Sequence, residues 1–88
     1  MNRVIKFGSA NCGPCKTMKP MFEKFAAEIE DGVEVIELDV DESSQEAEKY
    51  GIQSIPTTIF IKDDKVAKIA KGVITTQGLH QTYNKIFK

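Results

Sequence analysis

The chain has two cysteines, and both stand in the tetrapeptide Cys12-Gly13-Pro14-Cys15. Two thiols at this spacing can open to a dithiol or close to a disulfide, and such a pair can exchange electrons with another disulfide. A disulfide that closes so short a loop removes little entropy from the unfolded chain, so structural cross-linking explains it poorly. A closed zinc site needs four ligands, and the one histidine, His80, is distant in sequence. The spacing therefore favours a redox-active pair.

The residues around the motif predict that it lies at the N-terminus of a helix. A short strand-like stretch and a turn precede the motif, and helical periodicity follows it. Free N–H groups and the helix dipole favour an anion at such a position, and that anion would be the Cys12 thiolate. Pro14 suits the first helical turn, and Gly13 lets another backbone approach the sulfur. We expect Cys12 to attack a disulfide and Cys15, deeper in the turn, to complete the reaction.

Hydrophobic periodicity predicts the elements that position the motif. Residues 12–30 carry apolar side chains at helical spacing, namely Met18, Met21, Phe22, Phe25, Ala26 and Ile29. Pro20 should kink this helix, and the Asp-Gly pair at 31–32 should end it. Residues 3–7 and 33–40 read as strands on either side of the helix. A strand, a long helix and a second strand predict two parallel strands joined by a right-handed crossover.

The second half of the chain predicts a short helix and then a hairpin. The sequence Ser-Ser-Gln-Glu at 43–46 resembles a capping box that opens a helix, and Tyr-Gly at 50–51 should close it. Residues 57–61 and 65–70 have strand-like composition and flank an Asp-Asp turn at 63–64. These two strands should pair antiparallel.

A last helix should follow the hairpin. Gly72 breaks the preceding strand, and Thr75 or Thr76 should cap the helix. Its inner face would consist of Leu79, Tyr83, Ile86 and Phe87. His80 stands beside this face, and we expect it to be exposed and without a catalytic role. The order β-α-β-α-β-β-α predicts an α/β domain over residues 1–88, with one mixed four-stranded sheet and helices on both faces.

Size and charge limit the partners and the compartment that we expect. The 88 residues suffice for one domain with a modest core. The net charge is -1, and acidic and basic residues are interspersed, so nothing indicates nucleic acid or a membrane surface. No apolar run approaches the roughly 18 residues of a membrane span, and the first three residues lead directly into a strand. We expect a cytoplasmic monomer without a signal peptide, because paired cysteines in a reducing cytosol tend to be catalytic.

Several motifs taken together resemble the thioredoxin family. They are Cys-Gly-Pro-Cys-Lys at 12–16, Pro20, Lys-Tyr-Gly-Ile at 49–52, Ser-Ile-Pro-Thr at 54–57, and Gly72 after the hairpin. The resemblance covers nearly the whole chain and implies a thioredoxin-like fold. The first strand and helix of the family have no counterpart, which implies a shortened thioredoxin of near-glutaredoxin length.

This resemblance implies roles for individual residues. Cys12 would be the nucleophile and Cys15 the resolving cysteine of a protein disulfide reductase that needs no cofactor and no metal. Pro56 would form a cis bond beside the disulfide, and Ile55 would offer backbone groups to an extended substrate segment. The remaining rim of the substrate site would consist of Gly13, Gly72 and Val73. The implied partners are disulfide-containing proteins and a thioredoxin reductase or an equivalent electron donor.

The chain departs from the family beneath and beside the motif. Thioredoxins usually carry tryptophans just before the first cysteine, whereas residues 8–11 here are Gly-Ser-Ala-Asn, so we expect a more open and more polar rim. The buried acid of the family falls on Lys6, and its partner lysine falls on Glu37.

We therefore expect Lys6 and Glu37 to pair beneath the motif, with Lys6 the closer to Cys15. The ammonium would favour the Cys15 thiolate and make the couple more oxidising, or it would relay the Cys15 proton. In the alternative, Lys6 extends to solvent at the strand end and has no role in the reaction.

Two other functions remain open from the sequence. A glutathione-linked, glutaredoxin-like oxidoreductase fits the length, but the Gly-Pro centre of the motif and the lack of an evident glutathione carboxylate site count against it. A non-catalytic thioredoxin-like binding module, or a subunit that holds a metal between two copies of the motif, would use the same fold. Insulin reduction with a thioredoxin reductase, compared with a glutathione assay, distinguishes the protein disulfide reductase from the glutaredoxin-like oxidoreductase. The metal content after purification under reducing conditions tests the metal-holding subunit.

Overall fold

A mixed four-stranded sheet organises the computed structural model, which describes residues 1–29 and 32–88. The elements are β1 (Arg3–Gly8), α1 (Gly13–Glu28), β2 (Glu34–Asp39), α2 (Ser44–Lys49), β3 (Thr57–Lys62), β4 (Lys65–Lys71) and α3 (Thr76–Phe87). Across the sheet the strands lie in the order β2-β1-β3-β4. The β1–β2 pair is parallel, and the other two pairs are antiparallel. The predicted order of elements and the predicted α/β class are therefore confirmed.

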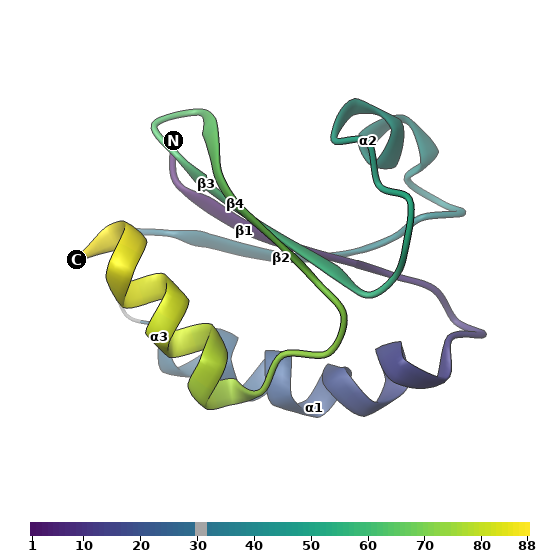
Figure 1. Cartoon of the computed structure of the whole chain (residues 1–88), viewed down its shortest axis with the longest axis horizontal. Coiled ribbons are helices and arrows are strands. Elements are labelled where there is room, and N and C mark those ends of the chain that lie inside the picture. Colours follow the sequence, from purple (N-terminus) through teal and green to yellow (C-terminus); the bar gives the residue numbers. More distant parts are fainter. Residues whose placement is uncertain (30–31) are drawn as a thin grey trace.

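Helices cover both faces of the sheet, as the sequence predicted. Helices α1 and α3 lie on one face and α2 lies on the other (Figure 1). Because side chains alternate along a strand, Val4 of β1 packs with α1 and α3, whereas Ile5 and Phe7 pack toward α2. The larger core cluster consists of Val4, Met18, Phe22, Phe25, Phe60, Leu79 and Tyr83. The smaller one consists of Ile5, Phe7, Ile59 and Ile61.

Helix α1 buries the apolar face that its sequence predicted. Met18, Phe22 and Phe25 are buried, at the spacing that brings side chains onto one side of a helix. Pro20 lies inside the helix, which continues for two further turns. The helix ends at Glu28, and the predicted stop at 31–32 includes Asp31, which lies outside the described residues.

The capping box predicted for α2 is wrong. Ser43 holds the N-cap position, but its side chain makes no capping hydrogen bond. Instead the Asp39 carboxylate at the end of β2 accepts hydrogen bonds from the N–H groups of Asp41 and Glu42, at 2.8 and 3.4 Å. The Ser43 N–H, which the Glu46 side chain would bind in a capping box, donates instead to the Asp39 carbonyl oxygen at 2.8 Å. The predicted helix end is confirmed, since Gly51 follows with a φ of +64°.

The hairpin and the last helix follow the sequence prediction. Asp63 and Asp64 have φ values of 53° and 65°, which is the geometry of a two-residue hairpin turn. Strand β4 ends before Gly72, whose φ is +89°. Thr75, one of the two predicted caps, accepts a hydrogen bond on its hydroxyl oxygen from the Gly78 N–H at 3.1 Å.

His80 is more enclosed than the sequence predicted. Its side chain is 31% exposed and lies 2.8 Å from a carboxylate oxygen of Glu28. The imidazole also meets the Phe25 ring edge-on, with centroids 5.0 Å apart. His80 therefore joins α3 to α1, because the two helices pack side by side on one face of the sheet.

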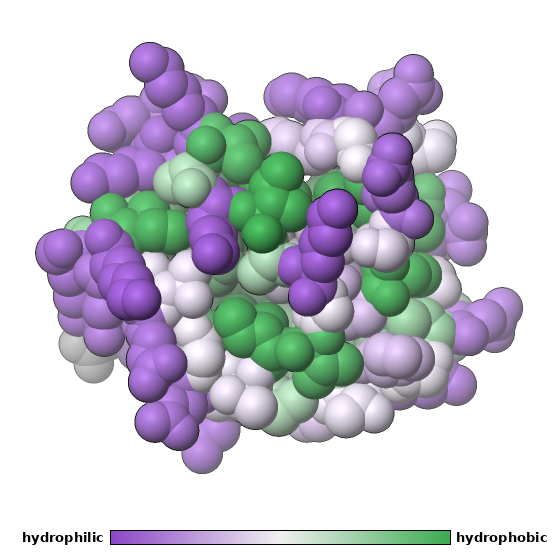
Figure 2. Space-filling view, in the orientation of Figure 1, coloured by the Kyte–Doolittle hydropathy of each residue, from purple (hydrophilic) through white to green (hydrophobic). Residues whose placement is uncertain are grey.

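The face seen in Figure 2 has several hydrophobic patches near its centre, separated and surrounded by hydrophilic side chains. The large hydrophobic residues exposed among the described residues are Met1, Val66, Ile69 and Val73. None of the helices within the described ranges is long and apolar enough to cross a membrane.

Candidate active site

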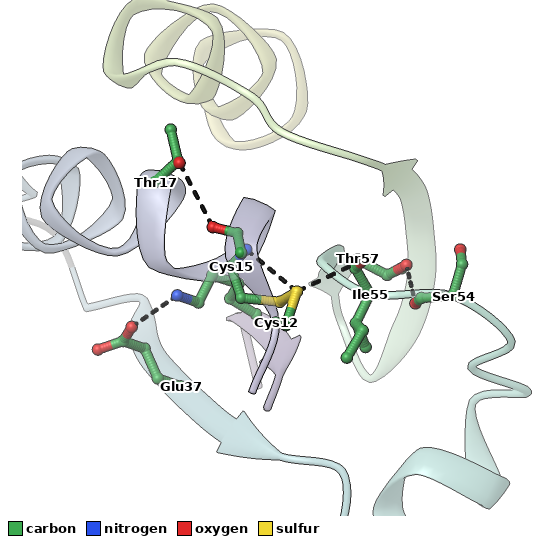
Figure 3. The surroundings of a disulfide bond; sticks show 9 residues. Cys12, Cys15, Thr17, Glu37, Ser54, Ile55 and Thr57 are labelled. Atoms are coloured by element: carbon green, nitrogen blue, oxygen red, sulfur yellow. Dashed lines mark hydrogen bonds and ion pairs between the residues drawn. A yellow bond between two sulfur atoms is a disulfide. The ribbon is translucent and has the colours of Figure 1, made fainter. Parts of the chain in front are cut away.

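The two cysteines form a disulfide at the N-terminus of α1 (Figure 3). Cys12 is the N-cap residue, and its sulfur accepts a hydrogen bond from the Cys15 N–H at 3.1 Å. Pro14 occupies the first helical turn, where no N–H is needed. Cys12 is partly exposed, whereas Cys15 is only 5% exposed. The predicted placement of the motif at a helix start is therefore confirmed.

The loop before β3 lies against the disulfide. The Ile55–Pro56 peptide bond is cis, as predicted. The carbonyl oxygen of Ile55 lies 4.0 Å from the Cys12 sulfur, within reach of a thiol proton when the pair is reduced (Figure 3). The Thr57 hydroxyl donates to the Ser54 carbonyl at 2.7 Å and braces this loop, a contact that the sequence reasoning missed.

The segment after β4 adjoins the same loop. The Gly72 N–H donates to the Pro56 carbonyl oxygen at 2.8 Å, which fixes the end of the hairpin beside the cis-proline. Val73 follows and is 46% exposed. The structure thus links three of the sequence-predicted rim positions, Pro56, Gly72 and Val73, to the Ile55 carbonyl that faces Cys12. Gly13, the other predicted rim residue, is exposed in the first turn of α1.

An open pocket of about 440 Å³ adjoins Cys15 between β1, β2 and the start of α1. Its lining is rich in charged side chains and consists of Lys6, Gly8, Ser9, Ala10, Cys15, Lys16, Lys19, Glu37, Leu38, Asp39 and Glu42. Gly8, Ser9 and Ala10, three of the four residues in the segment where the family carries tryptophans, therefore border this pocket. Within residues 1–29 and 32–88, no group of three or more His, Cys, Asp or Glu side chains could hold a metal ion.

Lys6 and Glu37 form the predicted ion pair. They stand opposite each other in the parallel β1–β2 register, and the ammonium lies 2.9 Å from the carboxylate. A dashed line at the labelled Glu37 marks this ion pair in Figure 3. The Lys6 side chain is only 6% exposed and its ammonium lies 5.5 Å from the centroid of the Phe22 ring. The alternative in which Lys6 extends to solvent is therefore wrong. The reason is that its strand position faces α1 rather than the sheet edge.

Glu37 also contacts a second lysine. Its other carboxylate oxygen lies 3.7 Å from the Lys19 ammonium, which in turn lies 3.1 Å from Glu23 one helical turn further along α1. The hydrogen bond to Glu23, together with the charge of Glu37, raises the pKa of Lys19 above its ordinary value. The sequence reasoning missed Lys19, although its i, i+4 spacing to Glu23 is a recognisable helical pair.

Gly8 is a further residue that the sequence reasoning did not assign to the site. A Cβ atom at this position would lie 3.2 Å from the Cys15 sulfur and 3.4 Å from its Cβ. The absence of a side chain at the end of β1 therefore lets the helix start approach the sheet. In the sequence, the only indication of the contact between Gly8 and Cys15 was a glycine placed between a predicted strand and the cysteine motif.

Substituting Gly8→Ala is expected to destabilise the oxidised protein by about 1–3 kcal/mol, because the added methyl group must displace a sulfur held in a disulfide. Gly13→Ala is a matched control in the same motif, since a Cβ there meets nothing within 4 Å. That control should leave the stability unchanged or raise it by up to about 1 kcal/mol. Urea unfolding of both variants measures the difference, and equal stabilities would refute the proposed tight contact.

Comparisons with known proteins agree with this arrangement. The thioredoxin family model matches residues 1–85. The thioredoxin of Bacillus subtilis is 38% identical over 82 residues, which span 93% of this chain and 79% of that protein. The thioredoxin of Staphylococcus aureus is 35% identical over 83 residues, which span 94% of this chain and 80% of that protein.

Solved structures extend the similarity to the fold. The thioredoxin of Fasciola hepatica superposes with a TM-score of 0.87 at 34% identity, over 97% of this chain and 80% of that one. A malarial protein superposes with a TM-score of 0.89 over 100% of this chain and 99% of that one, but at 18% identity it shows the fold alone. The chain therefore belongs to the thioredoxin family, and with its Cys12–Cys15 pair it is a thiol–disulfide oxidoreductase of the thioredoxin type.

Proposed function

We propose that this chain reduces disulfides in partner proteins, with Cys12 as the attacking residue and Cys15 as the resolving residue. The observation that carries this assignment is the asymmetry of the pair. Cys12 is partly exposed and its sulfur accepts a hydrogen bond from the Cys15 N–H at the helix start, whereas Cys15 is buried. The same N–H and the positive end of the helix stabilise a thiolate on Cys12 once the disulfide is reduced.

The proposed reaction has two displacement steps. The Cys12 thiolate attacks one sulfur of the substrate disulfide, forms a mixed disulfide and expels the other substrate sulfur as a thiolate. Cys15 then loses its proton and attacks the Cys12 sulfur, which forms the Cys12–Cys15 disulfide and releases the second substrate thiolate. The substrate has gained two electrons; one of its thiolates takes up the proton that Cys15 gave up, and the other takes a proton from water. An external donor of two electrons, a thioredoxin reductase or its equivalent, returns the chain to the dithiol.

The substrate segment is proposed to lie in the shallow rim between Ile55 and Val73. The Ile55 carbonyl is directed at the Cys12 sulfur, and the exposed Val73 side chain offers apolar contact. Backbone groups on such a rim pair with an extended chain of any sequence, while the apolar contact adds affinity. Gly13, Pro56 and Gly72 would keep this surface low enough for a disulfide to reach Cys12. We place the reaction in the cytoplasm, where an electron donor keeps thiols reduced, with the chain acting as a monomer.

Insulin reduction tests the proposed function. With dithiothreitol as the electron donor, the chain should accelerate insulin precipitation at least roughly tenfold over the donor alone, and Cys12→Ser should abolish the acceleration. NADPH with a thioredoxin reductase should replace dithiothreitol, whereas glutathione with its reductase should not. Absence of acceleration with dithiothreitol would refute disulfide reduction. Turnover with glutathione alone would favour the glutaredoxin-like alternative.

A further inference from the structure

The Lys6–Glu37 ion pair lies on the sheet face that α1 covers, next to the cysteines. Val4, Lys6 and Gly8 alternate onto this face of β1, since Val4 belongs to the core beneath α1 and the Gly8 Cβ position faces the Cys15 sulfur. Lys6 is thus the residue next to Gly8 on this face of β1, and Gly8 contacts Cys15. Lys6 and Cys15 line the same pocket.

Lys6 differs from every other charge around that pocket in its burial. Among the residues that the structure describes, it is the one charged residue that is buried. The other charged groups facing the pocket are Lys16 and Lys19 from α1, Glu37 and Asp39 from β2, and Glu42 from the following turn. The Lys19 side chain is 59% exposed and that of Glu37 31% exposed, so water screens their charges more than that of Lys6.

The counter-charge of Lys6 is shared with another cation. Glu37 contacts Lys6 through one carboxylate oxygen and Lys19 through the other. Lys19 has a closer partner in Glu23, at 3.1 Å, so these two lysines and two glutamates balance in number. They do not balance in position: the Lys6 side chain is 6% exposed and that of Glu37 is 31% exposed, so the positive member of the pair is the more buried one in the pocket that Cys15 also lines.

We propose, resting on the function above, that the Lys6 ammonium stabilises the Cys15 thiolate and makes the Cys12–Cys15 couple more oxidising. Reduction adds two electrons to the disulfide, and the two sulfurs then take up two protons or retain part of the negative charge. The disulfide carries no charge, so an ammonium close by stabilises only the reduced form. It also eases the loss of the Cys15 proton that precedes the second displacement.

Equilibration with glutathione, followed by thiol quantification, tests the proposal on the isolated chain. Lys6→Met removes the charge and keeps a long apolar side chain. It should shift the equilibrium roughly tenfold toward the disulfide, which is a potential about 30 mV more negative. Glu37→Gln removes the counter-charge and should shift the equilibrium in the opposite direction. Lys68→Met removes an exposed lysine on the edge strand β4 and should shift nothing.

The opposite signs distinguish an electrostatic role from a structural one. Shifts in the same direction for Lys6→Met and Glu37→Gln, or a shift in neither, would overturn the proposal. The potential should also be followed against pH, because the pH at which its slope changes marks thiol ionisation, and Lys6→Met should move that change to higher pH. If Lys6→Met does not fold, the sign and pH profile of Glu37→Gln decide the question alone.

The test of Lys6 can fail independently of the test of the proposed function. Equilibration with glutathione needs neither a substrate protein nor a reductase. An unshifted potential in a chain that still reduces insulin would refute only the role of Lys6. Failure to reduce insulin, with the shifts as expected, would refute only the proposed disulfide reductase function.

Discussion

Substituting Cys15→Ser is expected to lower disulfide turnover by roughly a thousandfold or more and to leave the chain covalently joined to its substrate. Cys12 retains its place at the helix start, so the first displacement still occurs. A serine hydroxyl cannot displace the substrate sulfur, and the reaction stops at the mixed disulfide. The group that donates to the Cys12 sulfur is the backbone N–H of residue 15, so this substitution leaves the stabilising hydrogen bond in place.

Non-reducing electrophoresis and intact-mass measurement detect the adduct directly. Cys12→Ser is the matched control, since it changes the same sulfur to oxygen in the same motif and should give neither turnover nor adduct. An adduct with Cys12→Ser and none with Cys15→Ser would mean that the two roles are reversed. Partner proteins captured by Cys15→Ser and released by a reductant identify the substrates.

Substituting Phe25→Ala is expected to cost about 3–5 kcal/mol of unfolding free energy, the usual range for a buried phenylalanine. Phe25 is 0% exposed and stands where α1, α3 and the sheet meet. Its ring centroid lies 5.9 Å from that of Phe22 and 6.0 Å from that of Tyr83. A chain of 88 residues has a total stability of roughly 4–13 kcal/mol, so this loss is a large part of it.

Thermal unfolding of the oxidised protein measures the effect, and a melting temperature lower by roughly 15 °C or more is expected. Lys24→Ala is the control, because this neighbour is exposed on the same helix and its loss should change stability by less than about 0.5 kcal/mol. Similar melting temperatures for the two variants would contradict the central position assigned to Phe25.

The sequence by itself determined the elements and their order. The spacing of Met18, Phe22 and Phe25 specifies one buried face of a helix wherever that helix packs, because the period of the helix is local geometry. The Asp-Asp turn at 63–64 and Gly72 are likewise local, since each sets the backbone of its own residue. The crossover rule then leaves few arrangements for a strand, a long helix and a strand, and the two cysteines fall at a helix start.

Only the tertiary structure decided which side chains surround the cysteines. Lys6 was open to two interpretations until the β1–β2 register placed Glu37 opposite it and α1 packed over the Lys6 side chain. The contact of Gly8 with Cys15 likewise depends on how closely a helix docks on a sheet. Such contacts join residues distant in sequence, and their geometry is set by the packing of the whole core. A pattern of neighbouring residues contains no information on how closely a helix packs on a sheet. The charged residues beneath Cys15 could therefore be named from the sequence, but their burial could not be predicted.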